Sequence, residues 1–251
     1  MTDMIKQVVQ AIVVQSLKNI LLRIFKLSLS VSLLCIALTP VSAQETGESE
    51  VGNWLMYFGS HKLDDKFSIH HEGQLRLYER TSNFNQLLLR YGLNYHLSPT
   101  AMLTAGYANI TTATFDKEDF EVRTNEHRIW QQFILRNKVG RLAFEHRYRL
   151  EQRWITSDDI PDDYTNRARY RIFFTLPLSN KDMLDKTLFF AFYDEIFLNL
   201  NDNPFSQNRF YLALGYKFNS NISVQSGYLR NKIGPNEFDR LQFAVFLNTG
   251  S

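Results

Sequence analysis

The chain of 251 residues is close to electrical neutrality, with a formal net charge of +2, which gives no reason to expect a nucleic-acid partner. Its single cysteine excludes a fold held together by intramolecular disulfides. Aromatic residues make up 14% and charged residues 22% of the sequence, and this combination is typical of a barrel with an apolar outside and a polar inside.

The first 43 residues predict an export signal. Lys18, Arg23 and Lys26 precede an apolar stretch over residues 27–38, and Pro-Val-Ser-Ala at 40–43 forms a cleavage site for a signal peptidase. A membrane-anchoring helix is the alternative, but the apolar stretch is shorter than the roughly 20 residues that span a bilayer. We therefore expect residues 1–43 to be a cleaved signal peptide with an extended n-region, and residues 44–251 to form the mature domain.

From Asn53 onward, segments of alternating polarity are separated by turn residues, a pattern that predicts β-strands. We expect strands at 53–59, 66–79, 84–97, 101–112, 124–138, 141–154, 164–177, 186–199, 207–218, 221–233 and 238–248. The expected fold is all-β, a transmembrane antiparallel up-and-down β-barrel of about 10–12 strands. Because bacterial barrels of this kind have even strand numbers, residues 53–59 form an extra strand or plug beside ten strands, or a twelfth strand exists.

The connections between the predicted strands alternate in length. Tight turns are expected at 97–100, 139–140 and 219–221, whereas residues 113–123 and 155–163 form longer polar connections. Outer-membrane barrels place short turns in the periplasm and longer loops outside the cell. We therefore expect the cell outer membrane of a Gram-negative bacterium as the location, with lipid and lipopolysaccharide as surroundings and the barrel-assembly machinery as a partner during insertion.

The hairpin around Val139-Gly140 allows a test of strand register. In residues 141–154 the odd positions are mostly charged and the even positions mostly apolar or aromatic, so that one face is ionic. A slip of one residue would turn the charges towards lipid, at about 2–4 kcal/mol for each Arg or Lys at mid-depth. With Val139-Gly140 as the turn, the residues that face each other are Arg128 and Glu151, Glu126 and Arg153, and Trp130 and Arg149.

The same inward row can be followed through the other strands and predicts a charged lumen. Its expected members are Glu72, Arg76, Arg90, Glu126, Arg128, Glu145, Arg147, Arg149, Glu151, Arg153, Arg167, Arg169, Arg171, Glu195, Arg209 and Arg240. One interpretation is a lumen that binds or selects anions, because guanidinium groups match carboxylates and phosphates. The favoured interpretation is a salt-bridge network that fills and stiffens a narrow barrel.

The strand predicted at 186–199 fits this pattern least well. An outward face that contains Leu188, Phe190, Phe192 and Ile196 also carries Asp194. A β-bulge near Tyr193-Asp194-Glu195 would turn that carboxylate inward, and we expect one there.

Six segments of the mature chain together carry a likeness to a known family. They are Asn53-Trp54-Leu55-Met56-Tyr57, Asn85-Gln86-Leu87-Leu88-Leu89-Arg90, the run from Glu126 to Gln132, the run from Phe144 to Arg153, Arg167-Ala168-Arg169-Tyr170, and Tyr193-Asp194-Glu195. With these segments the chain resembles an uncharacterised outer-membrane family, the domain-of-unknown-function 2490 family. The resemblance extends over nearly all of the mature chain and implies an outer-membrane barrel, without implying an activity, a catalytic residue or a ligand.

Residues that could carry catalysis or bind metal have simpler structural explanations. His127 and His146 would need a neighbouring serine for acyl-transfer chemistry, and the predicted register gives them none. His70 and His71 point to opposite faces of a strand, which argues against shared metal ligation. The glutamates have arginine neighbours, which favours ion pairing over glycosidic acid–base chemistry. The acidic run 158–163 lacks a calcium-loop pattern.

The sequence therefore predicts no metal and no cofactor, and no catalytic residue. It favours an outer-membrane barrel of structural, adhesive or narrow-pore type. A lipid- or lipopolysaccharide-modifying outer-membrane enzyme is one alternative. A soluble, lipocalin-like binder of the periplasm is a second, although its outward rings would expose a broad apolar belt to water.

Overall fold

The computed structural model describes residues 51–80, 83–113, 122–157, 161–201 and 204–250. The predicted signal peptide at 1–43 lies outside these residues. Within them, no helix is long and apolar enough to cross a membrane.

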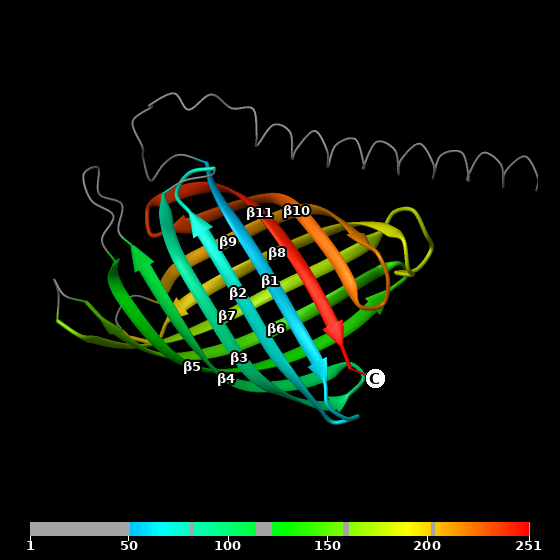
Figure 1. Ribbon diagram of the computed structural model, residues 1–251, viewed down its shortest axis with the longest axis horizontal. Coiled ribbons are helices and arrows are strands. Elements are labelled where there is room, and N and C mark those ends of the chain that lie inside the picture. The colour runs from blue at the N-terminus through cyan, green and yellow to red at the C-terminus, as the bar shows by residue number, and fades with distance from the viewer. Residues whose placement is uncertain (1–50, 81–82, 114–121, 158–160, 202–203, 251) are drawn as a thin grey trace, which may run out of the picture. The chain divides into compact units, whose positions relative to one another are not determined.

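Eleven strands form one closed barrel (Figure 1). The strands are β1 (Gly52–Lys62), β2 (Phe67–Leu77), β3 (Phe84–Ser98), β4 (Ala101–Ala113), β5 (Val122–Val139), β6 (Leu142–Thr156), β7 (Asp163–Pro177), β8 (Thr187–Asn199), β9 (Phe205–Lys217), β10 (Ile222–Ile233) and β11 (Asn236–Thr249). This confirms the all-β barrel and the predicted range of strand number. Each predicted segment agrees with an observed strand to within three residues at both ends.

The barrel closes through β1, which lies between β2 and β11 (Figure 1). Residues 53–59 are thus part of the wall and not a plug. Every pair of strands adjacent in sequence is antiparallel, but β1 and β11 are parallel, from Gly52 opposite Arg240 to His61 opposite Thr249. The expectation of a wholly antiparallel barrel was wrong at this seam, because the first and last of an odd number of alternating strands run in the same direction.

The two openings of the barrel differ in their connections. We call the opening where β1 begins the N-terminal end, and the opening where β11 ends the C-terminal end. The tight turns predicted at 97–100, 139–140 and 219–221 all lie at the C-terminal end, between β3 and β4, β5 and β6, and β9 and β10. The stretches 113–123 and 155–163 both connect strands at the N-terminal end. Two connections depart from this pattern: residues 178–186 join β7 to β8 at the C-terminal end, and residues 234–235 join β10 to β11 at the N-terminal end.

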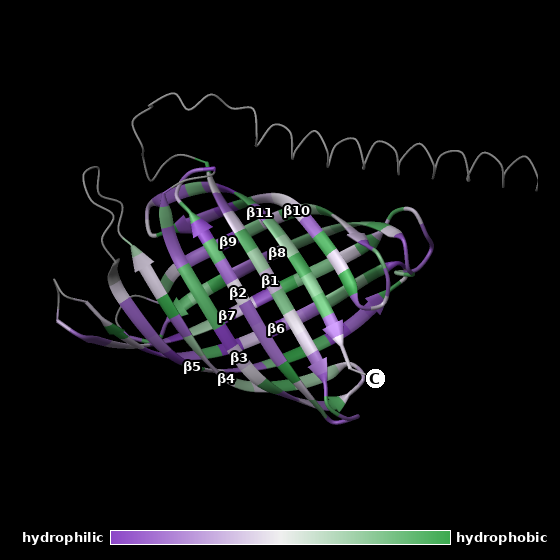
Figure 2. Cartoon of the chain, viewed as in Figure 1, coloured by the Kyte–Doolittle hydropathy of each residue, from purple (hydrophilic) through white to green (hydrophobic). Residues whose placement is uncertain are grey.

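Hydropathy alternates along the strands, as Figure 2 shows, and the inward positions are mostly polar. Among the described residues, 22 polar or charged residues are buried, against 19 hydrophobic ones. Large apolar side chains such as Tyr91, Leu150 and Leu214 are exposed on the outer face. The fold is therefore inverted relative to a water-soluble domain, in which hydrophobic residues dominate the interior.

The hairpin between β5 and β6 departs from the predicted register by two residues. Val139 pairs with Leu142, so that the two loop residues are Gly140 and Arg141 rather than Val139 and Gly140. Gly140 has a φ of 60°, and two-residue hairpin turns need a positive φ at their first loop position, which glycine adopts without strain. A shift of two residues preserves the faces, because side chains alternate with a period of two.

Strand β8 is regular where a bulge was expected. Its pairing with β7 runs without a shift from Arg167 to Pro177, and its pairing with β9 is continuous through Tyr193, Asp194 and Glu195. Asp194 remains on the outer face, where the Asn208 side-chain amide donates to its carboxylate at 3.1 Å. This neighbouring amide supplies a polar partner outside the barrel, so the strand needs no bulge.

Two glycines make room for a large ring inside the barrel. Gly92 of β3 lies directly opposite Gly106 of β4, and the fully buried indole of Trp130 packs over both. A Cβ atom on Gly106 would lie 2.1 Å from the Tyr91 carbonyl oxygen and 2.9 Å from the indole. Any larger residue at Gly106 must therefore displace backbone as well as Trp130.

We predict that Gly106→Ala lowers the free energy of unfolding by about 1–3 kcal/mol, the usual effect of overpacking a close-packed interior. Urea unfolding of the purified protein measures this change. Gly73→Ala is the matched control, because its Cβ would meet only Leu89 at 3.9 Å on the outer face. Equal effects of the two substitutions would contradict the packing described for Trp130.

Candidate functional site

The sixteen residues of the predicted charged lumen all occupy inward positions and are buried or half-buried. They are spread around the barrel: Glu72 and Arg76 on β2, Arg90 on β3, Glu126 and Arg128 on β5, Glu145, Arg147, Arg149, Glu151 and Arg153 on β6, Arg167, Arg169 and Arg171 on β7, Glu195 on β8, Arg209 on β9 and Arg240 on β11. We refer to these residues as the lumen network.

Glu151 lies at the centre of the network, and no part of it is exposed to solvent. Arg167 donates to its Oε2 through Nε at 2.9 Å and Nη2 at 2.6 Å. Arg169 Nη1 lies 2.8 Å and Arg128 Nη1 3.3 Å from Oε1. One carboxylate thus accepts hydrogen bonds from arginines of two strands, which compensates for the loss of hydration of all four groups.

Glu195 extends the network towards the C-terminal end. Arg147 Nη2 donates to its Oε1 at 2.6 Å, and Arg169 reaches the same oxygen through Nη2 at 2.9 Å. Arg169 therefore bridges Glu195 and Glu151. Nearer that end, Glu145 accepts from Arg171 at 2.7 Å.

Glu126 and Glu72 hold arginines closer to the N-terminal end. Arg153 donates to Glu126 through Nε at 2.7 Å and Nη2 at 2.9 Å, and Arg128 Nε donates to the same carboxylate at 2.7 Å. Arg90 Nη1 donates to Glu72 at 2.9 Å. The expected contacts between Glu126 and Arg153 and between Arg128 and Glu151 thus form although these residues are not directly opposite, because the long side chains reach diagonally.

Aromatic rings support several guanidinium groups from behind. The guanidinium carbon of Arg149 lies 4.8 Å and that of Arg90 5.3 Å from the Trp130 ring centroid. The first of these cation–π contacts was expected from the sequence, although Glu151 rather than Arg149 is the direct partner of Trp130 in register. The guanidinium carbon of Arg169 lies 4.2 Å from the Phe197 ring centroid.

Two arginines have neutral amide partners in place of carboxylates. Arg76 donates to Gln86 Oε1 at 2.6 Å and to Gln74 Oε1 at 2.5 Å. Arg209 Nε donates to Asn231 Oδ1 at 3.2 Å. Both guanidinium groups also lie on the Trp54 ring, at 4.0 Å for Arg76 and 4.8 Å for Arg209. Trp54 was not predicted in this role, because its position depends on closure between β1 and its neighbours.

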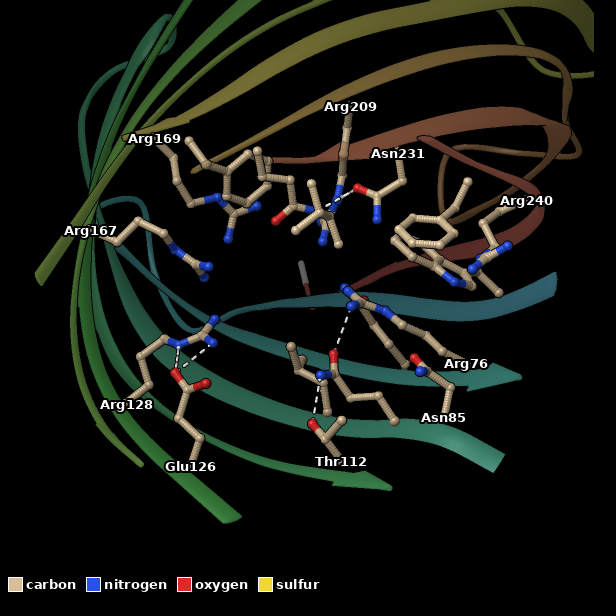
Figure 3. Close-up of a pocket in the computed structure, with 18 of the residues that line it drawn as sticks. Arg76, Asn85, Thr112, Glu126, Arg128, Arg167, Arg169, Arg209, Asn231 and Arg240 are labelled. Carbon is tan, nitrogen blue, oxygen red and sulfur yellow. Dashed lines mark hydrogen bonds and ion pairs between the residues drawn. The ribbon is translucent and has the colours of Figure 1, made fainter. Parts of the chain in front are cut away.

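A cavity of about 280 Å³ opens in the N-terminal half of the barrel (Figure 3). Its lining comes from every strand, and guanidinium groups project into it from opposite walls in Figure 3. The arginines that line it are Arg76, Arg90, Arg128, Arg153, Arg167, Arg169, Arg209 and Arg240. Glu126 is the one carboxylate among the described lining residues.

A cluster of apolar and aromatic side chains fills the interior on the C-terminal side of this cavity. Its buried members are Trp54, Met56, Phe189, Ala191, Tyr193, Tyr211, Ala213, Leu229 and Ala244, with Phe58, Phe173, Met183 and Phe246 packed against them. Tyr211 has no exposed surface, and its ring lies 4.8 Å from that of Tyr193. We call this cluster, which consists of side chains that project inward from the strands of the wall, the aromatic plug.

The histidines considered for catalysis are not adjacent to serine hydroxyls. His146 Nδ1 is hydrogen-bonded to the Tyr170 hydroxyl at 2.9 Å, and His127 is hydrogen-bonded to the Tyr107 hydroxyl. His70 points inward and contacts Glu72 at 3.2 Å. Within the described residues, no group of three or more histidine, cysteine or acidic side chains could hold a metal ion. Residues 158–160 of the acidic run lie outside the described part of the chain.

We predict that Glu151→Gln lowers the free energy of unfolding by about 3 kcal/mol or more, because it leaves buried arginines without a negative partner. The measurement is urea unfolding of the purified protein, followed by tryptophan fluorescence. Glu237→Gln is the control: the Glu237 side chain is 48% exposed and pairs with Lys232 at 3.6 Å, so its loss should change stability by less than about 1 kcal/mol. A neutral effect of Glu151→Gln would show that the network contributes nothing to stability.

Comparisons with known proteins agree with the resemblance noted from the sequence. No curated protein and no solved structure matches the chain. A family of proteins of unknown function, DUF2490, matches residues 51–242, from just before β1 into β11. The match includes every member of the lumen network. The chain therefore belongs to the domain-of-unknown-function 2490 family.

Proposed function

We propose that the protein is an integral outer-membrane β-barrel with an occluded interior and a structural role in that membrane. The observation that carries this proposal is the apolar outer face. Large hydrophobic side chains with more than a third of their surface exposed occur on nearly every strand, among them Leu55, Leu89, Ile129, Leu212 and Leu241. A soluble monomer rarely exposes so continuous an apolar surface, whereas acyl chains match it.

The strands have the dimensions that a membrane requires. Each has at least 11 residues, and about 9–11 tilted residues span the hydrocarbon core. Outward aromatic pairs lie near both ends: Phe67 packs against Tyr95 towards the C-terminal end, and Trp154 packs against Tyr164 towards the N-terminal end. Such rings favour the boundary between acyl chains and water.

The turn lengths favour an orientation. Three tight turns at the C-terminal end, at 97–100, 139–140 and 219–221, suit the periplasmic side. The longer connections 113–123 and 155–163 at the N-terminal end suit the outside of the cell, and the β7–β8 and β10–β11 connections depart from this pattern. In this orientation the arginine-lined cavity lies in the outer half of the barrel.

The filled interior favours a structural role over a pore. The lumen network and the aromatic plug occupy the section through which ions would have to pass, and Glu151, Trp130 and Tyr211 have no exposed surface there. A lipocalin-like role fits less well, because an interior lined by buried guanidinium and carboxylate groups provides no apolar cavity for a hydrophobic ligand.

A substitution on the outer face separates a membrane barrel from a soluble one. We predict that Leu150→Arg, in the middle of β6 and 48% exposed, destabilises the protein in lipid by about 2–4 kcal/mol and reduces its assembly in the outer membrane. Leu63→Arg is the control, because Leu63 is 51% exposed but lies in the turn between β1 and β2. The measurements are membrane fractionation and unfolding in lipid vesicles.

A soluble barrel would tolerate Leu150→Arg as well as it tolerates Leu63→Arg, since both side chains would already face water. Recovery of the unmodified protein from the soluble periplasmic fraction would likewise contradict the membrane proposal.

We further predict that the refolded protein shows no steady ion conductance in a planar lipid bilayer, because side chains fill the lumen. Stepwise conductance increases at 1 M KCl, with the protein correctly folded, would contradict the occluded interior and favour a pore.

A further inference from the structure

We propose that the arginine-lined cavity at the N-terminal end is a binding site for a compact soluble polyanion that carries at least two phosphate groups. This inference concerns the cavity alone and does not depend on a membrane location, so it is tested on the purified protein. Four observations support it: the charge balance, the partners of Arg76 and Arg209, the rings beneath them, and the size of the cavity.

Positive charge exceeds negative charge in the described interior. The lumen network contains eleven arginines and five glutamates, so that the carboxylates neutralise fewer than half of the guanidinium groups. Eight arginines and one glutamate, Glu126, line the cavity. Five of these arginines already pair with carboxylates of the lumen network, namely Arg90, Arg128, Arg153, Arg167 and Arg169. Arg76 and Arg209 form no such ion pair among the described residues, and an anion in the cavity would supply one.

Arg76 and Arg209 are the residues most available to a ligand. Their observed side-chain acceptors are the amide oxygens of Gln74, Gln86 and Asn231, which position the guanidinium groups without cancelling their charge. The buried Nε of Arg76 has no hydrogen-bond partner. Figure 3 shows both side chains directed into the cavity from opposite walls, β2 and β9.

The rings beneath these arginines organise the site before a ligand arrives. The guanidinium groups of Arg76 and Arg209 both stack on the Trp54 ring. The guanidinium carbons of Arg167 and Arg209 lie 5.2 Å and 4.7 Å from the Phe197 ring centroid. A guanidinium that rests on a ring is restrained by the cation–π contact, while its N–H groups can point towards an acceptor. The arginines therefore lose little conformational entropy on binding, which favours affinity.

The dimensions of the cavity favour a small ligand of high charge density. Its volume of about 280 Å³ lies at the lower limit of ordinary ligand sites, which occupy about 300–1,000 Å³. A phosphate group brings about 1.5–2 negative charges and three acceptor oxygens, so two of them supply more charge and more acceptors than carboxylates of the same volume. The closed ring of strands separates the cavity from lipid, which favours a soluble ligand.

The first experiment is a titration of the refolded full mature barrel in a neutral detergent with inorganic pyrophosphate, inorganic phosphate and citrate at constant ionic strength. Calorimetry measures the affinity, and a change in tryptophan fluorescence, to which Trp54 contributes together with Trp130 and Trp154, provides a second signal. We expect saturable binding of one pyrophosphate, at least about tenfold tighter than phosphate or citrate. Pyrophosphate should also raise the midpoint of thermal unfolding of the unmodified protein. Absence of saturable binding would overturn the proposal, and equal or tighter binding of citrate would overturn the assignment to phosphate.

The second experiment locates the site. We expect Arg76→Gln and Arg209→Gln each to weaken pyrophosphate binding about tenfold or more, and Arg76→Lys to have a smaller effect because it retains the charge. Arg230→Gln is the control, since Arg230 lies at the same end of the barrel but on the outer face, paired with Asp239 at 3.2 Å. Heat-modifiable migration on a gel checks that each variant is folded. If Arg230→Gln weakened binding as much as the inner substitutions, the cavity would not be the site.

Discussion

The structure depends on carboxylates that each hold several arginines inside a closed ring of strands. Register alone places arginines opposite one another: Arg128 faces Arg153, and Arg149 faces Arg169. Like charges directly across a pair of strands are unfavourable. Glu126 accepts from both members of the first pair, and Glu151 lies within 4 Å of both members of the second. The carboxylates therefore bridge pairs of arginines that would otherwise repel each other across the strands. The same contacts determine which side chains face the interior, because a slip of one residue would move the arginines to the outer face.

Arginine suits this interior better than lysine because it satisfies carboxylates, amides and rings at once. Arg169 contacts Glu151, Glu195 and the ring of Phe197. A lysine ammonium lacks the planar fork and the stacking surface. The glycines complete the arrangement: Gly92 and Gly106 allow Trp130 to lie against the wall, where it reaches both Arg90 and Arg149. Ring, glycine pair and guanidinium groups thus form one packed unit across β3, β4, β5 and β6.

The alternation of polarity was sufficient to predict the strands and their faces, because successive side chains of a strand point alternately to the polar interior and to the apolar outer face of the barrel. Details that depend on turn geometry or closure were not accessible in this way. The register between β5 and β6 was wrong by two residues, since the sequence does not show whether Gly140 is the first or the second loop residue. The parallel seam between β1 and β11 was not expected, because the sequence was interpreted with an even number of antiparallel strands in the barrel. Long side chains nevertheless preserved the expected contact between Arg128 and Glu151.

The cavity and the convergence of Arg76 with Arg209 were also beyond sequence reasoning, because they depend on how strands far apart in the chain curve towards each other. These two arginines also show that a structural network and a binding site need not be alternatives within one lumen. Arginines around Glu151 and Glu195 are engaged by carboxylates and form a stiff frame in the middle of the barrel. Arg76 and Arg209, nearer the N-terminal end, are held by amides and by Trp54, which orient a charge without neutralising it. The frame thus keeps the remaining positive charge in place, and an anion is the partner that such charge lacks.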